Sequence, residues 1–355
     1  MRRLGLALAL LTAALGARDT SACDSASCVL VTRGQDNVGK GVFSVDLSFR
    51  YSDESKRLLG SSSSDNVVIP RIDFDGQRLL PGFHRELSGD ANSLQADLAY
   101  GLTSRLTLQA SLPLFTRKGY AHAHLPVTTP PATDPGTGAE LPPEEGHGHG
   151  GPAAAIPIDR DYTTDGFGDT LVGASYAVWG TASKRLTAAA ALKLPTGQWK
   201  VPNTYDGGLH DPMLQPGTGS MCYLLAALYS HGGGSLSWAA SGSYQIATAN
   251  DLQYSFGDEA ILGLGVTRAL RPVQSRTMVA ASVQVKAHFR ARSTYLDAPV
   301  PSTGGRMVIL SPGLRLTTAG GFGVYAYLQL PVYSYVNDVQ LTTRSSILTG
   351  ITKGF

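Results

Sequence analysis

Apolar and small polar residues alternate along most of this 355-residue chain. In the stretch 41–51, Phe43, Leu47 and Phe49 fall on odd positions, and serine or charged residues fall between them. A period of two is typical of a β-strand with one apolar and one polar face. We count about twelve such segments, each near the 9–11 residues that a tilted membrane strand needs. They are 41–51, 94–102, 106–114, 172–178, 186–194, 217–229, 236–246, 259–268, 279–289, 308–316, 322–332 and 341–355.

The connections between these segments are alternately long and short. The longest are 52–92 and 117–164, whereas the turns at 103–104, 180–184 and 318–321 are short. Outer-membrane barrels join their strands by long extracellular loops and short periplasmic turns. The sequence therefore predicts an all-β fold, a transmembrane antiparallel β-barrel of about twelve strands with both termini on the periplasmic side. Whether loop 52–92 or loop 117–164 plugs the lumen is left open by the sequence.

A soluble β-sandwich is the main alternative, and composition argues against it. Charged residues make up 16% of the chain and hydrophobic residues 43%, with a mean hydropathy of −0.02, whereas soluble domains carry roughly 25% charged residues. A sandwich would also need charged outer faces and protected edge strands. No apolar run reaches the roughly 18 residues of a membrane helix. The net charge of +2 gives no basis for nucleic-acid binding.

The first residues have the organisation of an export signal. Arg2 and Arg3 precede a short apolar stretch, 4–17, and cleavage is expected after Ala17 or Ala22. We expect a signal peptide at 1–22, a periplasmic N-terminal segment at 23–40 and an outer-membrane barrel at 41–355, which places the protein in the bacterial outer membrane.

Three cysteines occur in this exported chain. Because export leads to an oxidising compartment, the spacing of Cys23 and Cys28 favours a small disulfide ring over a thiol metal or redox site. Lipid modification of Cys23 is a second alternative. Cys222 lies in an apolar segment, and we expect it to be inert.

The chain ends in Phe355, preceded on the same strand face by Ile351 and Ile347. Outer-membrane barrels commonly end in an aromatic residue that the barrel-assembly machinery reads. We therefore expect two partners at the membrane, the outer-membrane lipid and this machinery.

Three glycine-rich stretches lie between 165 and 229. They read Gly166-Phe167-Gly168-Asp169, then Leu192-Lys193-Leu194-Pro195-Thr196-Gly197, then Gly217-Thr218-Gly219-Ser220. Together with the strand that ends near Tyr176, they resemble the bacterial meta-pathway phenol-degradation family of transporter-like outer-membrane barrels. The resemblance implies an exported, pore-like barrel with small organic molecules as candidate solutes, and it implies no catalytic residues.

The polar faces of the predicted strands would line the lumen. Their charges are of mixed sign, so neither a basic ring nor an acidic ring for ion selection is evident, and pairing across the wall is the favoured reading. Many other inward positions are small, which leaves open volume, and Tyr325, Tyr327 and Tyr333 would line an aromatic path or pack against a plug. The predicted pore-lining residues are Asp46, Arg50, Asp97, Arg105, Asp169, Lys193, Lys286, Arg315, Tyr325, Tyr327 and Arg344.

Two His-X-His pairs, His122/His124 and His147/His149, fall in the connection 117–164. Imidazole with nearby carboxylates suits zinc or copper, but the surrounding Pro/Gly-rich sequence does not hold the ligands in place, so a solvated loop is the favoured reading. No other cofactor is expected.

Catalytic signals are weak. His288 lies on the polar face of its segment without a matching serine motif, and Gly-Phe-Gly-Asp lacks the features of a nucleotide loop. We expect a non-enzymatic channel or transporter for small solutes, apolar or aromatic ones among them. A metal-binding protein with a His-rich loop and a non-conducting structural or adhesion barrel are the alternatives.

Overall fold

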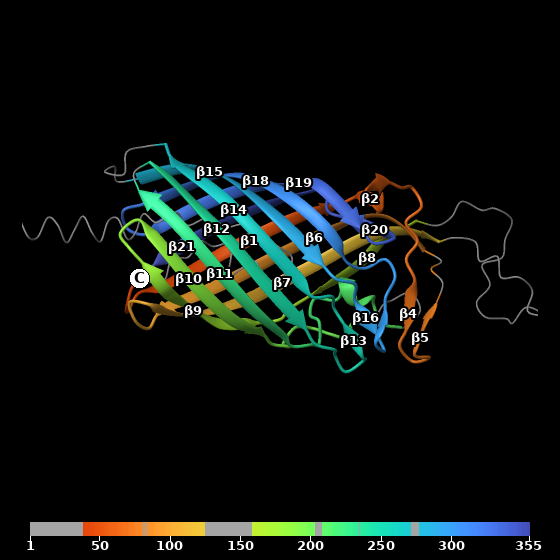
Figure 1. Ribbon diagram of the computed structural model, residues 1–355. Coiled ribbons are helices and arrows are strands. Elements are labelled where there is room, and N and C mark those ends of the chain that lie inside the picture. The colour runs from red at the N-terminus through yellow and green to blue at the C-terminus, as the bar shows by residue number, and fades with distance from the viewer. Residues whose placement is uncertain are drawn as a thin grey trace, which may run out of the picture.

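The computed structural model describes residues 38–80, 82, 84–124, 158–202, 208–233, 235–270 and 277–355. Its main sheet runs in the order β6-β1-β21-β19-β18-β15-β14-β12-β11-β10-β9-β7-β8 and closes through the pairing of β6 with β7. β8 and β9 both pair with β7, one after the other along its length. Because β8 and β9 occupy one position around the barrel, the wall has twelve antiparallel strand positions, as the sequence predicts (Figure 1).

The wall strands differ in length. The strands are β1 (Phe43–Glu54), β6 (His84–Gly101), β7 (Leu106–His124), β8 (Ile158–Gly166), β9 (Leu171–Gly180), β10 (Lys184–Lys193), β11 (Cys222–Gly233), β12 (Leu236–Ala247), β14 (Glu259–Ala269), β15 (Thr277–Arg290), β18 (Gly305–Thr318), β19 (Phe322–Val336) and β21 (Ser345–Gly354). β6 and β7 extend the wall at the outer end, whereas β10 to β12 stop earlier (Figure 1). Among the described residues, no helix has the length and hydropathy needed to cross a bilayer.

The first and last wall strands pair with each other and complete the ring. β1 pairs with β21 from Ser44↔Gly354 to Asp53↔Ser345, and with β6 on its other edge. Phe355 N–H donates to the Phe43 carbonyl at 2.8 Å. An open sheet edge would leave unpaired backbone groups in hydrocarbon, and this closure removes it.

Alternation gives the wall an apolar outer face and a polar inner face. Leu225 and Leu262 are 60% and 57% exposed on the outside, whereas Ser311 on the inside is 0% exposed. Large apolar side chains spread over the whole outer face require a hydrocarbon environment, because soluble proteins rarely expose large contiguous apolar patches. The apolar band is the surface that contacts lipid.

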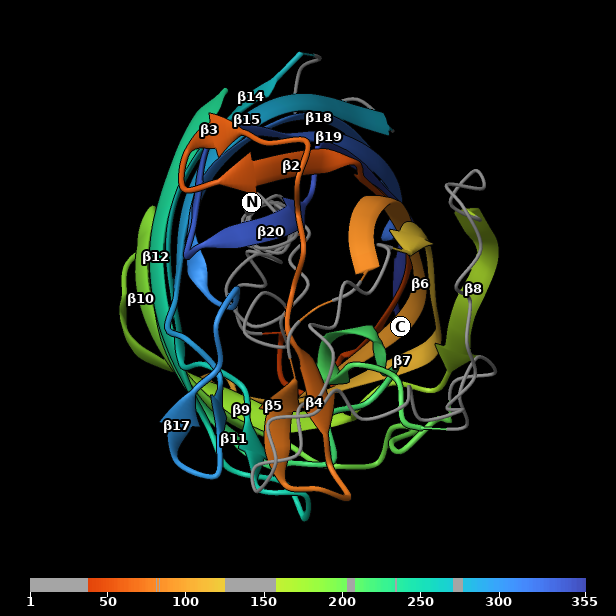
Figure 2. The same cartoon turned by 90° about the vertical axis from the view of Figure 1, so that its right-hand side faces the viewer.

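Small sheets cover the outer end, where the long connections meet (Figure 2). β2 (Lys56–Leu59), β3 (Ser62–Ser63) and β20 (Val339–Thr342) form one, β13 (Tyr254–Ser255), β16 (Thr294–Tyr295) and β17 (Ala298–Pro299) a second, and β4 (Arg71–Asp73) and β5 (Arg78–Leu80) a third. Ile72 packs against Tyr254, Tyr295 and Val300, so the first loop is joined to two loops from the opposite half of the sequence.

At the periplasmic end, the chain before β1 turns into the barrel. Val38 is buried, and its N–H donates to Oγ1 of Thr107, an inward residue of β7, at 3.0 Å. Gly101 permits this contact, because a Cβ there would lie 2.1 Å from the Gly39 carbonyl oxygen. The predicted signal peptide 1–22 and the Cys23–Cys28 ring lie outside the described residues.

Three expected boundaries are corrected. The predicted strand 217–229 begins only at Cys222, the first residue of β11. The predicted strand 341–355 is two strands, β20 and β21. Both of the long predicted loops, 52–92 and 117–164, contain parts of wall strands. β7 continues to His124, and β8 starts at Ile158. These strand extensions have polar residues on both faces. They therefore lack the apolar stripe by which the sequence analysis recognised strands.

Candidate functional site

A group of inward side chains around Tyr325 and Tyr327, which we call the tyrosine belt, lies near the periplasmic end of the lumen. The Tyr325 hydroxyl donates to Oδ1 of Asp46 at 2.8 Å, and the Arg315 guanidinium lies 5.1 Å from the centre of the Tyr325 ring. The ring of Tyr327 lies 5.9 Å from that of Tyr325, centre to centre. Asp97 lies directly across from Asp46 in the β1–β6 register, and both are buried.

Glycines set the position of these two tyrosine rings. A Cβ at Gly350 would lie 2.3 Å from the Tyr325 hydroxyl oxygen, and a Cβ at Gly313 would lie 2.1 Å from the Tyr327 ring. Each ring therefore lies flat against the wall over a glycine of a neighbouring strand. Flat rings occupy less of the bore than rings that project into it.

Between the tyrosine belt and the outer end of the barrel, polar residues also line the inner face. Lys286 and Gln284 on β15 are buried, and Ser311 on β18 lies directly across from Gln284. Glu259 on β14 faces Arg290 and His288 of β15, with O–N distances of 3.2 Å and 3.6 Å. Opposite charges on adjacent strands therefore pair at the upper end of the lumen, as the mixed signs of the inward residues suggest.

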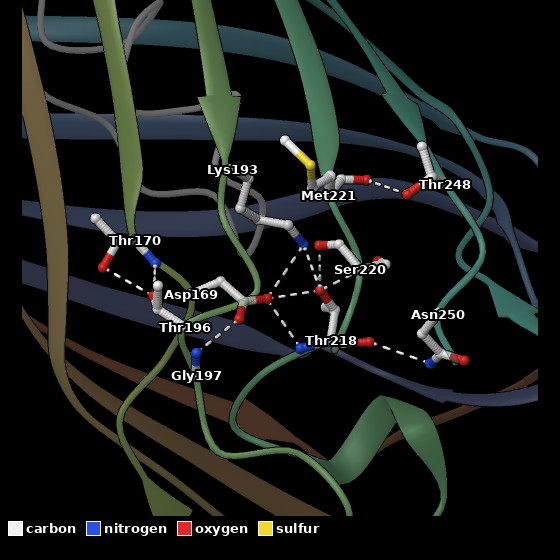
Figure 3. Close-up of polar contacts among 10 residues, drawn as sticks. All are labelled: Asp169, Thr170, Lys193, Thr196, Gly197, Thr218, Ser220, Met221, Thr248 and Asn250. Atoms are coloured by element: carbon white, nitrogen blue, oxygen red, sulfur yellow. Dashed lines mark hydrogen bonds and ion pairs between the residues drawn. The ribbon is translucent and has the colours of Figure 1, made fainter. Parts of the chain in front are cut away.

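At the outer end of β9 and β10, three chain segments meet around one carboxylate (Figure 3). Oδ1 of Asp169 accepts from the Gly197 N–H at 2.9 Å, and Oδ2 accepts from the Thr218 N–H and hydroxyl at 2.8 Å and 2.6 Å. Lys193 Nζ lies 3.6 Å from Oδ2 and donates to the Thr218 hydroxyl at 3.0 Å. We call this the Asp169 node.

The node brings together the three glycine-rich stretches that carry the family resemblance. Their backbones touch: a Cβ on Gly197 would lie 2.7 Å from the Gly168 carbonyl carbon, and a Cβ on Gly217 would lie 2.7 Å from the Gly197 carbonyl carbon. Only glycine allows this approach. The node ties the junction between β8 and β9 to the segments that follow β10 and precede β11.

A short segment, 208–215, lies in the mouth of the barrel and is held by the inner face of β7 and β8. Lys118 Nζ donates to the Met213 carbonyl at 2.6 Å, and the Thr164 hydroxyl donates to the Leu214 carbonyl at 2.5 Å. The segment contains a 3-10 turn, Pro212–Leu214, capped by Asp211 (Figure 2). We call it the mouth segment.

Two carboxyl groups approach each other where the mouth segment meets β6. Outward positions of β6 are apolar at Leu94 but polar at Asn92 and Asp90, so Glu86 lies in the part of β6 outside the membrane. Burial, together with the nearby carboxylate of Asp211, raises the pKa of Glu86 to about 8. Burial also raises the pKa of Asp211, while its hydrogen bond from Met213 N–H and the charge of Lys118 act in the opposite direction.

The structure separates the predicted pore-lining residues into three groups. Asp46, Arg50, Asp97, Lys286, Arg315, Tyr325 and Tyr327 lie on the inward strand faces. Asp169 and Lys193 belong to the node. Arg105 and Arg344 lie in exposed turns at opposite ends of the barrel, because an alternation counted past the end of a strand no longer assigns a face. Tyr333, expected on the aromatic path, is instead 45% exposed on the outer face, because a register shift between β18 and β19 reverses the alternation before it.

Two of the four histidines predicted as metal ligands lie on a wall strand. His122 lies on β7, buried on the inner face and across from Glu86, and His124 ends β7. His147 and His149 lie outside the described residues. Within the described ranges, no group of three candidate ligands is placed to hold a metal ion, so zinc or copper binding stays a prediction.

No protein-family model matches the chain, and no curated protein matches it. Several solved structures do match it. The COG4313 outer membrane channel from Pseudomonas putida F1 is 14% identical, with a TM-score of 0.54 over 90% of this chain and 98% of that one. A Pseudomonas aeruginosa FadL homologue is 11% identical, covering 90% of each chain, with a TM-score of 0.38. The CymD monoaromatic hydrocarbon channel is 12% identical over 89% of this chain and 88% of that one, with a TM-score of 0.37.

At such low identity a match shows the fold alone, and we take it from the COG4313 channel, whose TM-score is above one half. That fold is a closed barrel of the bacterial outer membrane. The apolar outer face and the closure of β1 on β21 are the properties that such a barrel needs in lipid.

Proposed function

We propose that this protein is a passive channel through which small solutes cross the outer membrane. The observation that carries the proposal is a set of enclosed polar atoms on the inward face. Within the described part of the chain, these atoms have no protein hydrogen-bond partner. They are Thr187 Oγ1, Ser243 Oγ, Gln245 Oε1, Gln284 Nε2 and Ser311 Oγ.

Enclosed polar atoms are nearly always paired, and water supplies the partner where protein does not. The five atoms belong to β10, β12, β15 and β18. Ser243, Gln284 and Ser311 each lie seven residues from the periplasmic end of their strand. Waters at these positions would hydrate part of the inner face, which supports a conduit over a fully packed, scaffold-like core.

The tyrosine belt limits the size of solute that the proposed channel admits. Tyr325 and Tyr327 are each 2% exposed, so neighbouring inward side chains, Arg315 among them, cover the ring faces that the wall glycines do not. A solute that displaces these side chains would stack on the rings, and such stacking would favour flat, aromatic solutes over aliphatic solutes of the same charge. We therefore propose small aromatic solutes as the preferred class.

Planar-bilayer recording with the purified barrel tests conduction. We expect single-channel currents from the wild type and larger currents from the Tyr327→Ala variant, because the truncation widens the constriction. Tyr223→Ala is the matched control, since Tyr223 is 48% exposed on the outer face. A barrel that folds in lipid but gives no current in either the wild type or Tyr327→Ala would instead be a non-conducting scaffold.

Reversal potentials in benzoate and hexanoate gradients test the solute class. We expect benzoate to be the more permeant anion in the wild type and in Tyr327→Phe, which keeps the ring. The preference should be lost in Tyr327→Ala. Equal permeability of the two anions in the wild type would contradict the aromatic preference while leaving the channel itself intact.

A further inference from the structure

Among the described residues, the charged side chains at the periplasmic rim of the barrel are all basic. Within the described turns at this end and the two residues of each wall strand that border them, six cations occur and no Asp or Glu. The cations are Lys40, Arg105, Lys184, Arg185, Arg268 and Lys353. The outer end differs, since it holds acids as well as bases, among them Asp65, Asp73, Asp251 and Asp338.

Three of these cations point out of the barrel. Lys184, Arg268 and Lys353 occupy the same face of their strands as the lipid-facing residues two positions away. Those neighbours are Leu186, Val266 and Ile351, which are 36%, 43% and 45% exposed. The three cations therefore lie directly below the apolar band, at the level of the lipid headgroups. We call them the basic rim.

Aromatic side chains surround the basic rim. The β-strand register places Lys184 across from His231, which stacks on Trp238 with ring centres 5.9 Å apart. Trp238 neighbours Val266 on β14, two residues before Arg268. On the far side of the barrel, Lys353 lies across from Phe322 and 5.8 Å above the Phe355 ring. Aromatic residues at the edge of an apolar band mark the membrane–water interface.

The rim cations retain hydrogen-bonding capacity for a ligand. Lys353 Nζ donates to the Gly320 carbonyl at 2.8 Å, and an ammonium group has three donors in all. Lys184 and Arg268 are exposed. Long basic side chains at an apolar boundary extend toward the headgroups, so all three cations are placed to reach the phosphates of the periplasmic leaflet.

We propose that the basic rim binds anionic phospholipid headgroups in the periplasmic leaflet of the outer membrane. Charge complementarity selects this occupant: headgroups with a net negative charge gain from a rim without acids, whereas a zwitterionic headgroup brings a cation of its own. A cation close to an anionic bilayer surface contributes about fivefold in affinity. Because the rim faces away from the lumen, this role is separate from conduction.

Native mass spectrometry of the full-length, detergent-solubilised barrel tests the proposal. We expect phosphatidylglycerol adducts at lower lipid concentration than phosphatidylethanolamine adducts. The triple variant Lys184→Gln/Arg268→Gln/Lys353→Gln should lose at least tenfold in apparent affinity for phosphatidylglycerol and keep its weak affinity for phosphatidylethanolamine. The matched control, Arg57→Gln/Arg71→Gln/Lys200→Gln, removes the same charge at the outer end and should bind as the wild type does.

Two further arms identify the source of the phosphate. Inorganic phosphate should not displace phosphatidylglycerol at equal concentration, because the apolar band holds the acyl chains as well; full displacement would mean a free-anion site. Heat-shifted gel mobility of the triple variant should match that of the wild type, which shows that the barrel is folded. The proposal is overturned if the folded triple variant retains wild-type affinity, or if the wild type does not distinguish the two lipids.

Discussion

Glu86 and Asp211 show how single residues couple the mouth segment to the wall. Lys118 holds the segment through the Met213 carbonyl, and Glu86 meets it as a neutral acid near neutral pH. With the mouth segment docked, the Glu86 carboxyl therefore keeps a proton that it would lose above about pH 4.5 once release of the segment exposed it to water. Docking of the mouth segment is most stable at low pH, weakens as pH rises toward about 8, and is constant above that.

The Glu86→Gln variant tests this coupling. Glutamine keeps the size of the side chain but cannot ionise, so docking should no longer weaken with pH. Hydrogen exchange of peptides covering 208–220, compared between variant and wild type at the same pH, removes the intrinsic pH dependence of exchange. We expect nearly equal protection at pH 4 and at least tenfold greater protection in the variant above pH 8, since one pKa unit corresponds to about 1.4 kcal/mol.

Asp90→Asn is the control for this comparison. It removes a carboxylate from the same strand, but on the outward side and away from the mouth segment, so protection of 208–220 should follow the wild type at every pH. Identical exchange in wild type and Glu86→Gln at high pH would mean that the carboxyl pair does not govern docking.

At the scale of elements, the Asp169 node explains how a wall built from unequal strands holds its shape. β10 ends at Lys193 and β11 begins at Cys222, so the chain between them has no place in the wall. The buried carboxylate of Asp169 accepts three hydrogen bonds from that chain. Losing such an acceptor leaves several donors unpaired at once, which costs more than the loss of an exposed ion pair.

Gly217→Ala tests the close approach of backbones at the node. The added Cβ would meet backbone atoms of Gly197, which cannot move aside as a flexible side chain can. Overpacking of this kind costs about 1–3 kcal/mol. We expect a lower midpoint for the heat-induced gel-mobility shift of the folded barrel in detergent.

Gly354→Ala is the matched substitution, because no atom lies within 4 Å of a Cβ there, and its midpoint should stay at the wild-type value. Equal midpoints for the two variants would show that the backbone crossing tolerates a side chain and that the node is looser than the packing indicates.

For the whole molecule, the sequence predicted the barrel well because the lipid-facing stripe repeats at every second residue. It was less informative wherever structure depends on contacts distant in sequence. The mouth segment has no period of its own, and its position comes from Lys118 and Thr164, far away in the chain. The inward tyrosines were found from alternation alone, whereas Gly313 and Gly350, which seat their rings, have no local signal.

The outward cations of the basic rim were also visible in the sequence but carried no meaning there. These cations, Lys184, Arg268 and Lys353, are spread over 170 positions of the chain. Only the closed barrel shows that all three lie at the same height, just below the apolar band. A search for basic residues that are close together in the sequence does not detect charges that a barrel places around its circumference.

Pairing of β1 with β21 brings Phe43 and Phe355 within hydrogen-bonding reach of each other, which makes the order of strands around the ring independent of where the polypeptide starts. A circular permutant can join Phe355 to Val38 through a short glycine linker and open new ends in the turn 181–183. It should form the same barrel of twelve strand positions. Its heat-shifted gel mobility should match that of the parent. Deletion of β21, in contrast, should leave a chain that never acquires the folded mobility, because β1 and β19 would both present bare edges to lipid.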